Sequence, residues 1–266
     1  MKVCLSGRQD REFLKKADEI KLEYRDRRVI TDFVKEYPGT NIIVELMGVD
    51  NTEIDWDALK EYNILVNNKF YVSVFSASQA RTAIKNGLKF YCGYPIESEY
   101  ELNGWIAAGS EYIILGMPLF FDIKRMKEIY GNKVKFRAVP NIAYLDGLPR
   151  ENGINGHWIR PEDMQLYSNY IDVFEFIFKT LKQEKALYKR YIELQEWPGS
   201  LKTIIINFDA EGSNAMILPE VAKARLSCRQ KCTQNGKCRI CYHAVALANP
   251  DKIKTYVEEE SEFTEE

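Results

Sequence analysis

Short apolar segments alternate with amphipathic stretches along roughly the first 200 residues. The apolar segments are rich in β-branched and aromatic residues, and most are apolar throughout, which is typical of strands covered on both faces. We predict eight strands, at Lys2–Leu5, Asn41–Leu46, Ile64–Asn67, Lys89–Cys92, Tyr112–Leu115, Val134–Val139, His157–Ile159 and Asp172–Phe176.

The amphipathic stretches between these segments predict helices. Thr31 and Ser78 are suited to cap two of them, because short hydroxyl side chains accept hydrogen bonds from free N–H groups at a helix start. Further helices are predicted over Glu99–Ala108, Asp122–Tyr130 and 178–195. Strands that alternate with helices in this way predict a (β/α)8 barrel of the TIM type. A doubly wound open sheet is the alternative, but the chain lacks the GxGxxG and GxxxxGK[ST] nucleotide signatures of that fold.

The chain has 266 residues, of which 45% are hydrophobic, and this is ample for a sizeable core. We expect the barrel over residues 1–200 and an extension over residues 201–257. The last nine residues, 258–266, include six glutamates and predict an acidic, disordered tail.

Four cysteines lie within fourteen residues of the extension: Cys228, Cys232, Cys238 and Cys241. Their spacing is C-x3-C-x5-C-x2-C, which is compact enough for four thiolates to surround one inorganic centre. Compact runs are typical of iron–sulfur clusters, whereas structural zinc sites usually separate two cysteine pairs by a dozen or more residues. We therefore expect these cysteines to be metal ligands, with a 4Fe-4S cluster favoured, zinc as the alternative, and plain thiols or disulfides as the third interpretation.

The N-terminal sequence MKVCLSGRQDREF lacks the apolar core of a signal peptide. The longest apolar run lies within Tyr112–Phe121 and is too short to span a bilayer. A cytoplasmic, reducing setting is therefore expected, in which clustered cysteines more often hold metal than form disulfides. Cys4 and Cys92 stand apart in apolar surroundings and are expected to be buried core residues.

Six basic residues and no acidic residue lie between Lys223 and Arg239, around the cysteines. They either compensate the negative thiolates or bind phosphate. The formal net charge of −2 gives no general reason to expect a nucleic-acid partner, so compensation is favoured. A small-molecule or RNA substrate and a protein partner remain possible partners of this basic cysteine loop, and no membrane partner is expected.

The segment HWIRPEDMQLYSNYIDVFEF, His157–Phe176, resembles the hallmark block of peptidase family U-32. Val134–Asn141 and Lys185–Leu201 extend the similarity. This resemblance implies a barrel and a cysteine-bound 4Fe-4S cluster, and places the chain near oxygen-independent hydroxylation factors that act on quinone precursors or RNA bases. Many members of the family have cysteines after the strand that corresponds to Val134–Val139, where this chain has none. Its cluster ligands would therefore be relocated to Cys228–Cys241, or the centre is a different one.

Catalytic groups of such barrels lie at the carboxyl ends of the strands. The candidates there are Glu45, Asn67, Asn68, Tyr94, Asn141, His157, Arg160 and Glu175. We select His157 as a general base, Arg160 as a clamp for a substrate carboxylate and Glu45 as an orienting or catalytic carboxylate. The alternatives are a His157 satisfied by backbone hydrogen bonds, and an Arg160 paired with Glu162, Asp163 or Glu45.

The chain has neither a GxSxG nor an HExxH motif, so the sequence contains no recognisable peptidase machinery. A redox or hydroxylation-type enzyme is the favoured hypothesis. The alternative is a non-catalytic binding or scaffold subunit whose cysteine-rich segment is held together by zinc or by a cluster.

Overall fold

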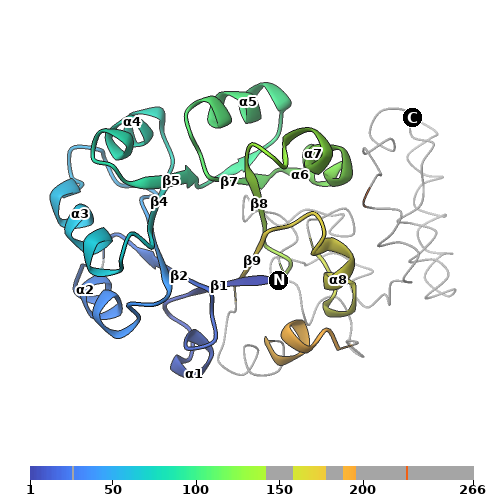
Figure 1. Ribbon diagram of the computed structural model, residues 1–266, viewed down its shortest axis with the longest axis horizontal. Helices are drawn as coiled ribbons and strands as arrows, with labels where there is room; N and C mark the ends of the chain where they lie inside the picture. Colours follow the sequence, from blue (N-terminus) through green and yellow to red (C-terminus); the bar gives the residue numbers. More distant parts are fainter. Residues whose placement is uncertain (26, 142–157, 178–187, 196–225, 227–266) are drawn as a thin grey trace, which may run out of the picture.

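The computed structural model describes residues 1–25, 27–141, 158–177, 188–195 and 226 (Figure 1). Their strands form one parallel sheet in the order β5-β4-β3-β2-β1-β9-β8-β7-β6. The strands are β1 (Lys2–Ser6), β2 (Glu19–Glu23), β3 (Asn41–Glu45), β4 (Phe70–Val74), β5 (Lys89–Cys92), β6 (Pro95–Ile96), β7 (Tyr112–Leu115), β8 (Lys135–Ala138) and β9 (Val173–Phe176).

The two ends of this strand order meet, and the sheet closes into a barrel. The N–H of Glu111, directly before β7, donates to the carbonyl of Phe90 on β5. Further along, Pro95 of β6 pairs with Ile114 of β7. β5 and β6 are thus two halves of one bent strand beside β7, and the barrel has eight strand positions. The predicted TIM-type barrel is confirmed by this parallel, closed arrangement.

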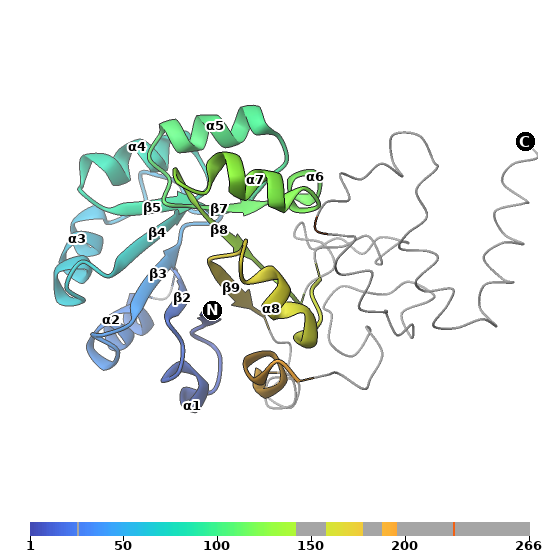
Figure 2. The same ribbon diagram turned by 45° about the vertical axis from the view of Figure 1, so that its right-hand side comes forward.

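Helices follow most strands and lie outside them, as both views show (Figures 1 and 2). They are α1 (Arg11–Leu14), α2 (Arg27–Glu36), α3 (Trp56–Leu65), α4 (Ala77–Lys85), α5 (Glu99–Ala107), α6 (Met117–Phe120), α7 (Ile123–Tyr130), η2 (Pro161–Asp163) and α8 (Met164–Tyr167). Residues 188–193 are also helical. None of the helices in the described part of the chain is long and apolar enough to cross a membrane.

Local sequence explains where several helices begin and end. Ser76 caps α4, because its Oγ accepts a hydrogen bond from the N–H of Gln79. The predicted cap, Ser78, is wrong by two residues and lies inside the helix. Gly87 and Gly109 follow α4 and α5 with φ of 67° and 87°, values that a glycine adopts without strain.

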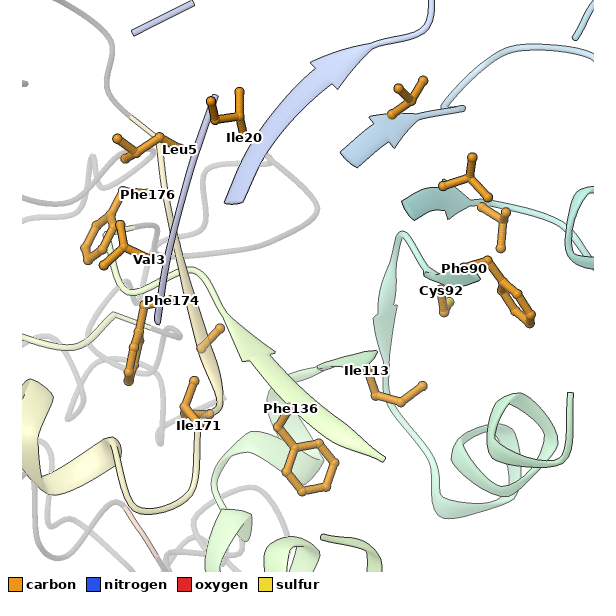
Figure 3. Packing of buried hydrophobic residues seen from close by; sticks show 14 of the residues in the cluster. Val3, Leu5, Ile20, Phe90, Cys92, Ile113, Phe136, Ile171, Phe174 and Phe176 are labelled. Atoms are coloured by element: carbon orange, nitrogen blue, oxygen red, sulfur yellow. The ribbon is translucent and has the colours of Figure 1, made fainter. Parts of the chain in front are cut away.

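Side chains alternate between the two faces of each strand and thereby form two apolar clusters. The larger cluster lies between strands and helices, and Figure 3 shows part of it, including Val3, Phe90, Phe136 and Phe174. The smaller cluster consists of Cys4, Ile43, Tyr71, Tyr91, Tyr112, Ile114 and Val173. Its members alternate with those of the larger cluster, as Val3 and Cys4 do, and therefore face the barrel interior.

Two of the eight predicted strands are wrong. Ile64–Asn67 covers the end of α3 and a turn in which Asn67 and Asn68 are left-handed, with φ of 54° and 61°. The strand of this repeat, β4, begins only at Phe70. Trp158 and Ile159 are not part of a strand, although the Ile159 N–H donates to the carbonyl of Pro140.

Candidate functional site

Five charged side chains project into the barrel interior from four strands. Glu19 and Lys21 belong to β2, Glu45 to β3, Arg137 to β8 and Glu175 to β9. In β2, whose sequence is EIKLE, the apolar Ile20 and Leu22 face the helices, so Glu19 and Lys21 face inward. The barrel interior therefore combines an apolar cluster with a network of charges.

Arg137 and Glu19 form the deepest ion pair of this network. An Nη atom of Arg137 donates to Glu19 at 2.6 Å, and the two side chains are 1% and 0% exposed. The guanidinium also lies over the rings of Tyr91 and Tyr112, at 4.7 and 5.2 Å from their centroids. Such contacts stabilise a cation that has been removed from water.

Lys21 joins this pair to the mouth of the barrel. Its Nζ lies 3.0 Å from Glu45 and 2.5 Å from Glu175. The Lys21 and Glu45 side chains are 20% and 16% exposed, and Glu45 is the last residue of β3, so this part of the network is reached by solvent. It lies at the carboxyl ends of the strands, where barrel enzymes bind their substrates.

Lys21 and Glu175 favour the charged form of each other. Burial lowers the pKa of Lys21, but Glu175, Tyr91 and Glu45 outweigh this effect and keep that pKa well above its ordinary value. Burial likewise raises the pKa of Glu175, but Lys21 and Arg137 lower it further than burial raises it. Lys21 is therefore an ammonium ion at neutral pH, which suits it to stabilise negative charge rather than to act as a nucleophile.

Several buried polar atoms of this region have no hydrogen-bond partner among the described residues. They are Ser73 Oγ, Tyr91 OH, Glu175 Oε2, and Nε and one Nη of Arg137. Arg137 Nε and Glu175 Oε2 are 3.8 Å apart, too far for a direct hydrogen bond. Buried polar groups are normally hydrogen-bonded, so these atoms are polar groups of the interior that the described residues leave unsatisfied.

Of the predicted site residues, one lies at the barrel mouth, one lies at a helix start, and the others fall outside the described residues. Glu45 lies at the mouth and pairs with Lys21. Arg160 directly precedes η2 and binds Asp163 at 2.6 Å and Glu162 at 3.3 Å, which is the helix-start pairing weighed as its alternative. His157 and the four cysteines, Cys228, Cys232, Cys238 and Cys241, lie outside the described residues.

The remaining candidates lie at the edge of the site or away from it. Asn67 and Asn68 precede β4 and so lie at the opposite end of the barrel. The Tyr94 hydroxyl accepts a hydrogen bond from Trp105 of α5. Asn141 is fully buried and exchanges hydrogen bonds with the backbone of Ile177, which ties the end of β8 to the end of β9.

The described residues contain no group of three or more His, Cys, Asp or Glu side chains that could hold a metal ion. A metal centre at Cys228–Cys241 therefore stays a prediction from the sequence. Lys21, Glu19 and Arg137 were absent from the predicted site. The alternation in EIKLE and in KFRA, residues 135–138, is the signal that could have revealed them.

No family model and no curated protein matches the sequence. Among solved structures, the chain is similar to a 4-hydroxy-2-oxoglutarate/2-dehydro-3-deoxyphosphogluconate aldolase, with 11% identity, a TM-score of 0.42, and coverage of 73% of this chain and 94% of the other. A native KDPGal structure gives 10% identity, a TM-score of 0.47, and coverage of 72% and 92%. A designed cube-shaped protein cage gives 11% identity, a TM-score of 0.47, and coverage of 99% of this chain and 83% of the other. At these scores the similarities carry no inference about activity.

The first prediction concerns the buried ion pair. Arg137→Met leaves the Glu19 carboxylate buried without its cation, and we expect a loss of about 3–5 kcal/mol in the free energy of unfolding. Arg8→Met is the matched control, because Arg8 and Glu23 form a pair whose side chains are 77% and 55% exposed. That change should cost less than about 1 kcal/mol. Equal losses in the two variants, measured by urea unfolding, would contradict the structural role of Arg137.

The second prediction concerns alkaline pH. Burial raises the pKa of Cys4, Cys92 and Tyr71 to about 12. In the unfolded chain these groups titrate near about 8.5 and about 10. Their contribution to stability is therefore complete below about pH 8.5 and is lost as the pH rises toward about 12, because the unfolded chain releases its protons first.

Urea unfolding between pH 7 and pH 11 measures this decline. The double variant Cys4→Ala and Cys92→Ala lacks two of the groups, so its stability should fall less steeply than that of the wild type. A wild-type stability that stays constant across this range would show that the groups titrate normally in the folded protein.

Proposed function

We propose that this chain is a barrel enzyme that binds a small polar substrate over Lys21, Glu45 and Glu175, and that it carries a metal centre on its four clustered cysteines. The observation that supports an enzyme is the ion-paired group at the mouth, where Lys21 and Glu45 are partly exposed while Glu175 is buried. Ionised groups that are half-removed from water and held in place by one another are typical of catalytic sites.

The two exposed members of this group have complementary roles in the proposal. Glu45 accepts a proton from the bound substrate, since its carboxylate pairs with Lys21 and is reached from the mouth. Lys21 stays protonated and stabilises the negative charge that develops on the substrate. Glu175 holds the ammonium group of Lys21 in position from the buried side.

The proposed reaction class comes from the resemblance to peptidase family U-32 and is a redox or hydroxylation-type modification. The donor set fits a cluster by its chemistry, because four cysteine thiolates are the usual ligands of a 4Fe-4S centre. Such a cluster supplies one-electron transfer when bound. Zinc is the alternative occupant of the same thiolates.

A second candidate function is a non-catalytic binding or scaffold subunit. It is supported by the buried pair of Arg137 and Glu19, because a pair removed from solvent contacts no substrate at the mouth. If the whole network is structural, the charged residues at the barrel mouth are explained without a substrate.

The third prediction tests the metal centre. Protein purified without air should contain iron and acid-labile sulfide, and replacement of Cys228, Cys232, Cys238 or Cys241 by serine should remove them, because each thiolate is a ligand. Cys4→Ser and Cys92→Ser are the matched controls, since both residues are buried in the barrel. They should keep the metal. Full metal content in all four single variants would refute the centre, whereas zinc without sulfide would select the alternative occupant.

The fourth prediction separates an enzyme from a scaffold. In cells that lack the protein, the wild type should restore a modified product that differs in mass from its precursor, whereas Glu45→Gln should not, because the amide cannot accept the proton. Glu36→Gln is the control, since Glu36 pairs with Arg11 on the outside of the barrel. Mass spectrometry of small molecules and of digested RNA measures the product, and equal restoration by both variants would favour the scaffold.

A further inference from the structure

A pocket lies beside the mouth of the barrel, at the loops that follow β2 and β3. It has a volume of about 480 Å³. Its lining consists of Tyr24, Arg25, Arg27, Arg28, Val49 and Glu53. Tyr24 lies three residues after Lys21, and Val49 lies four residues after Glu45, so this pocket continues from the two strands that carry the exposed part of the mouth.

Hydrogen bonds of one buried side chain, Tyr24, hold the loops that form this pocket in place. The buried Tyr24 hydroxyl accepts from Arg27 at 2.8 Å and from the N–H of Asp55 at 2.6 Å. It also lies 3.2 Å from the carbonyl of Glu53. The β2 and β3 loops are therefore joined to each other, and the pocket is organised before any ligand arrives.

The charges of the pocket favour an anion. Its lining carries three guanidinium groups and one carboxylate. Arg27 is paired with Asp55, and Arg25 donates to the carbonyl of Gly48. Within the described part of the chain, Arg28 makes no hydrogen bond or ion pair. Arg25 and Arg28 thus keep several N–H donors for a ligand with many acceptor atoms.

The backbone adds to this preference. α2 begins at Arg27 and is ten residues long, so the N–H groups and positive end of its dipole lie at the same loop. Guanidinium groups together with a helix start favour a phosphate group, which accepts several charge-assisted hydrogen bonds at once.

We propose that this arginine pocket binds the phosphate group of a small-molecule substrate whose reacting end lies over Lys21 and Glu45. The assignment rests on the proposed function, because it uses the mouth as the reaction site. The volume lies within the range of small-molecule sites, about 300–1,000 Å³. The net charge of −2 and the nearby Glu53 and Asp55 favour a small ligand over a nucleic acid, whose binding requires a wider basic surface.

The fifth prediction tests this pocket with inorganic pyrophosphate as the probe, by calorimetric titration of the full chain at low ionic strength. The wild type should bind with one site per chain. The double variant Arg25→Gln and Arg28→Gln should bind at least about tenfold more weakly, because it lacks two charge-assisted donors. Arg81→Gln removes an exposed arginine from α4, outside this pocket, and should bind as the wild type does.

Three outcomes would overturn the assignment: no saturable binding to the wild type, equal weakening by Arg81→Gln, or binding of a single-stranded RNA oligomer through Arg25 and Arg28 without binding of pyrophosphate. Thermal unfolding of each variant identifies any loss caused by misfolding, and in that case the single variant Arg28→Gln, which should also bind pyrophosphate more weakly than the wild type, replaces the double variant. The readout is independent of turnover. Absence of pyrophosphate binding to the wild type overturns this pocket alone, whereas restoration of product by Glu45→Gln overturns the reaction site alone.

Discussion

Arg137 reaches across the inside of the barrel from β8 to Glu19 on β2, two strands beyond its own neighbour β9. Neither side chain contacts solvent, so each charge is compensated by the other and not by water. Glu175 stands between them on β9, and Lys21 extends the same network to Glu45 on β3. One line of alternating charges therefore connects the barrel core to its mouth, and the position of the mouth residues follows from the buried pair.

This dependence explains why Lys21 is held so firmly. A lysine on a barrel strand has four rotatable bonds and ordinarily extends into solvent. Here two carboxylates lie within 3.0 Å of its ammonium group, one of them 4% exposed. Glu175 is fixed in turn by the attraction of Arg137, which lowers its pKa together with Lys21. The mouth thus acquires a positive charge that is held in place before a substrate binds.

Those parts of the fold that depend on a local sequence pattern could be predicted from the sequence. The interior charge network could not be predicted, because its contacts join residues that are distant in the sequence. Apolar runs such as Tyr112–Leu115 predicted strands at the right residues. β2 was missed because EIKLE has charges at every second position, which is the pattern of a strand that faces polar groups inside a barrel. Ile64–Asn67 was mistaken for a strand because its apolar residues end an amphipathic helix. Glu45 could be found as a carboxylate at the end of an apolar strand, but its partner could not. The Arg137–Glu19 pair joins residues 118 positions apart, and no local pattern specifies such a contact.

The charge balance of the interior also constrains how a substrate lies. The network contains three carboxylates, Glu19, Glu45 and Glu175, and two cations, Lys21 and Arg137, which leaves one negative charge in excess. A phosphate group that entered the barrel would be repelled by this excess and would lose its water. The arginine pocket lies outside the network, where the guanidinium groups of Arg25 and Arg28 remain exposed. The phosphate-bearing substrate that we propose would be oriented by these charges. In the proposed arrangement the anionic end of the substrate stays at the arginines, and its uncharged polar end lies over the partly exposed Lys21 and Glu45.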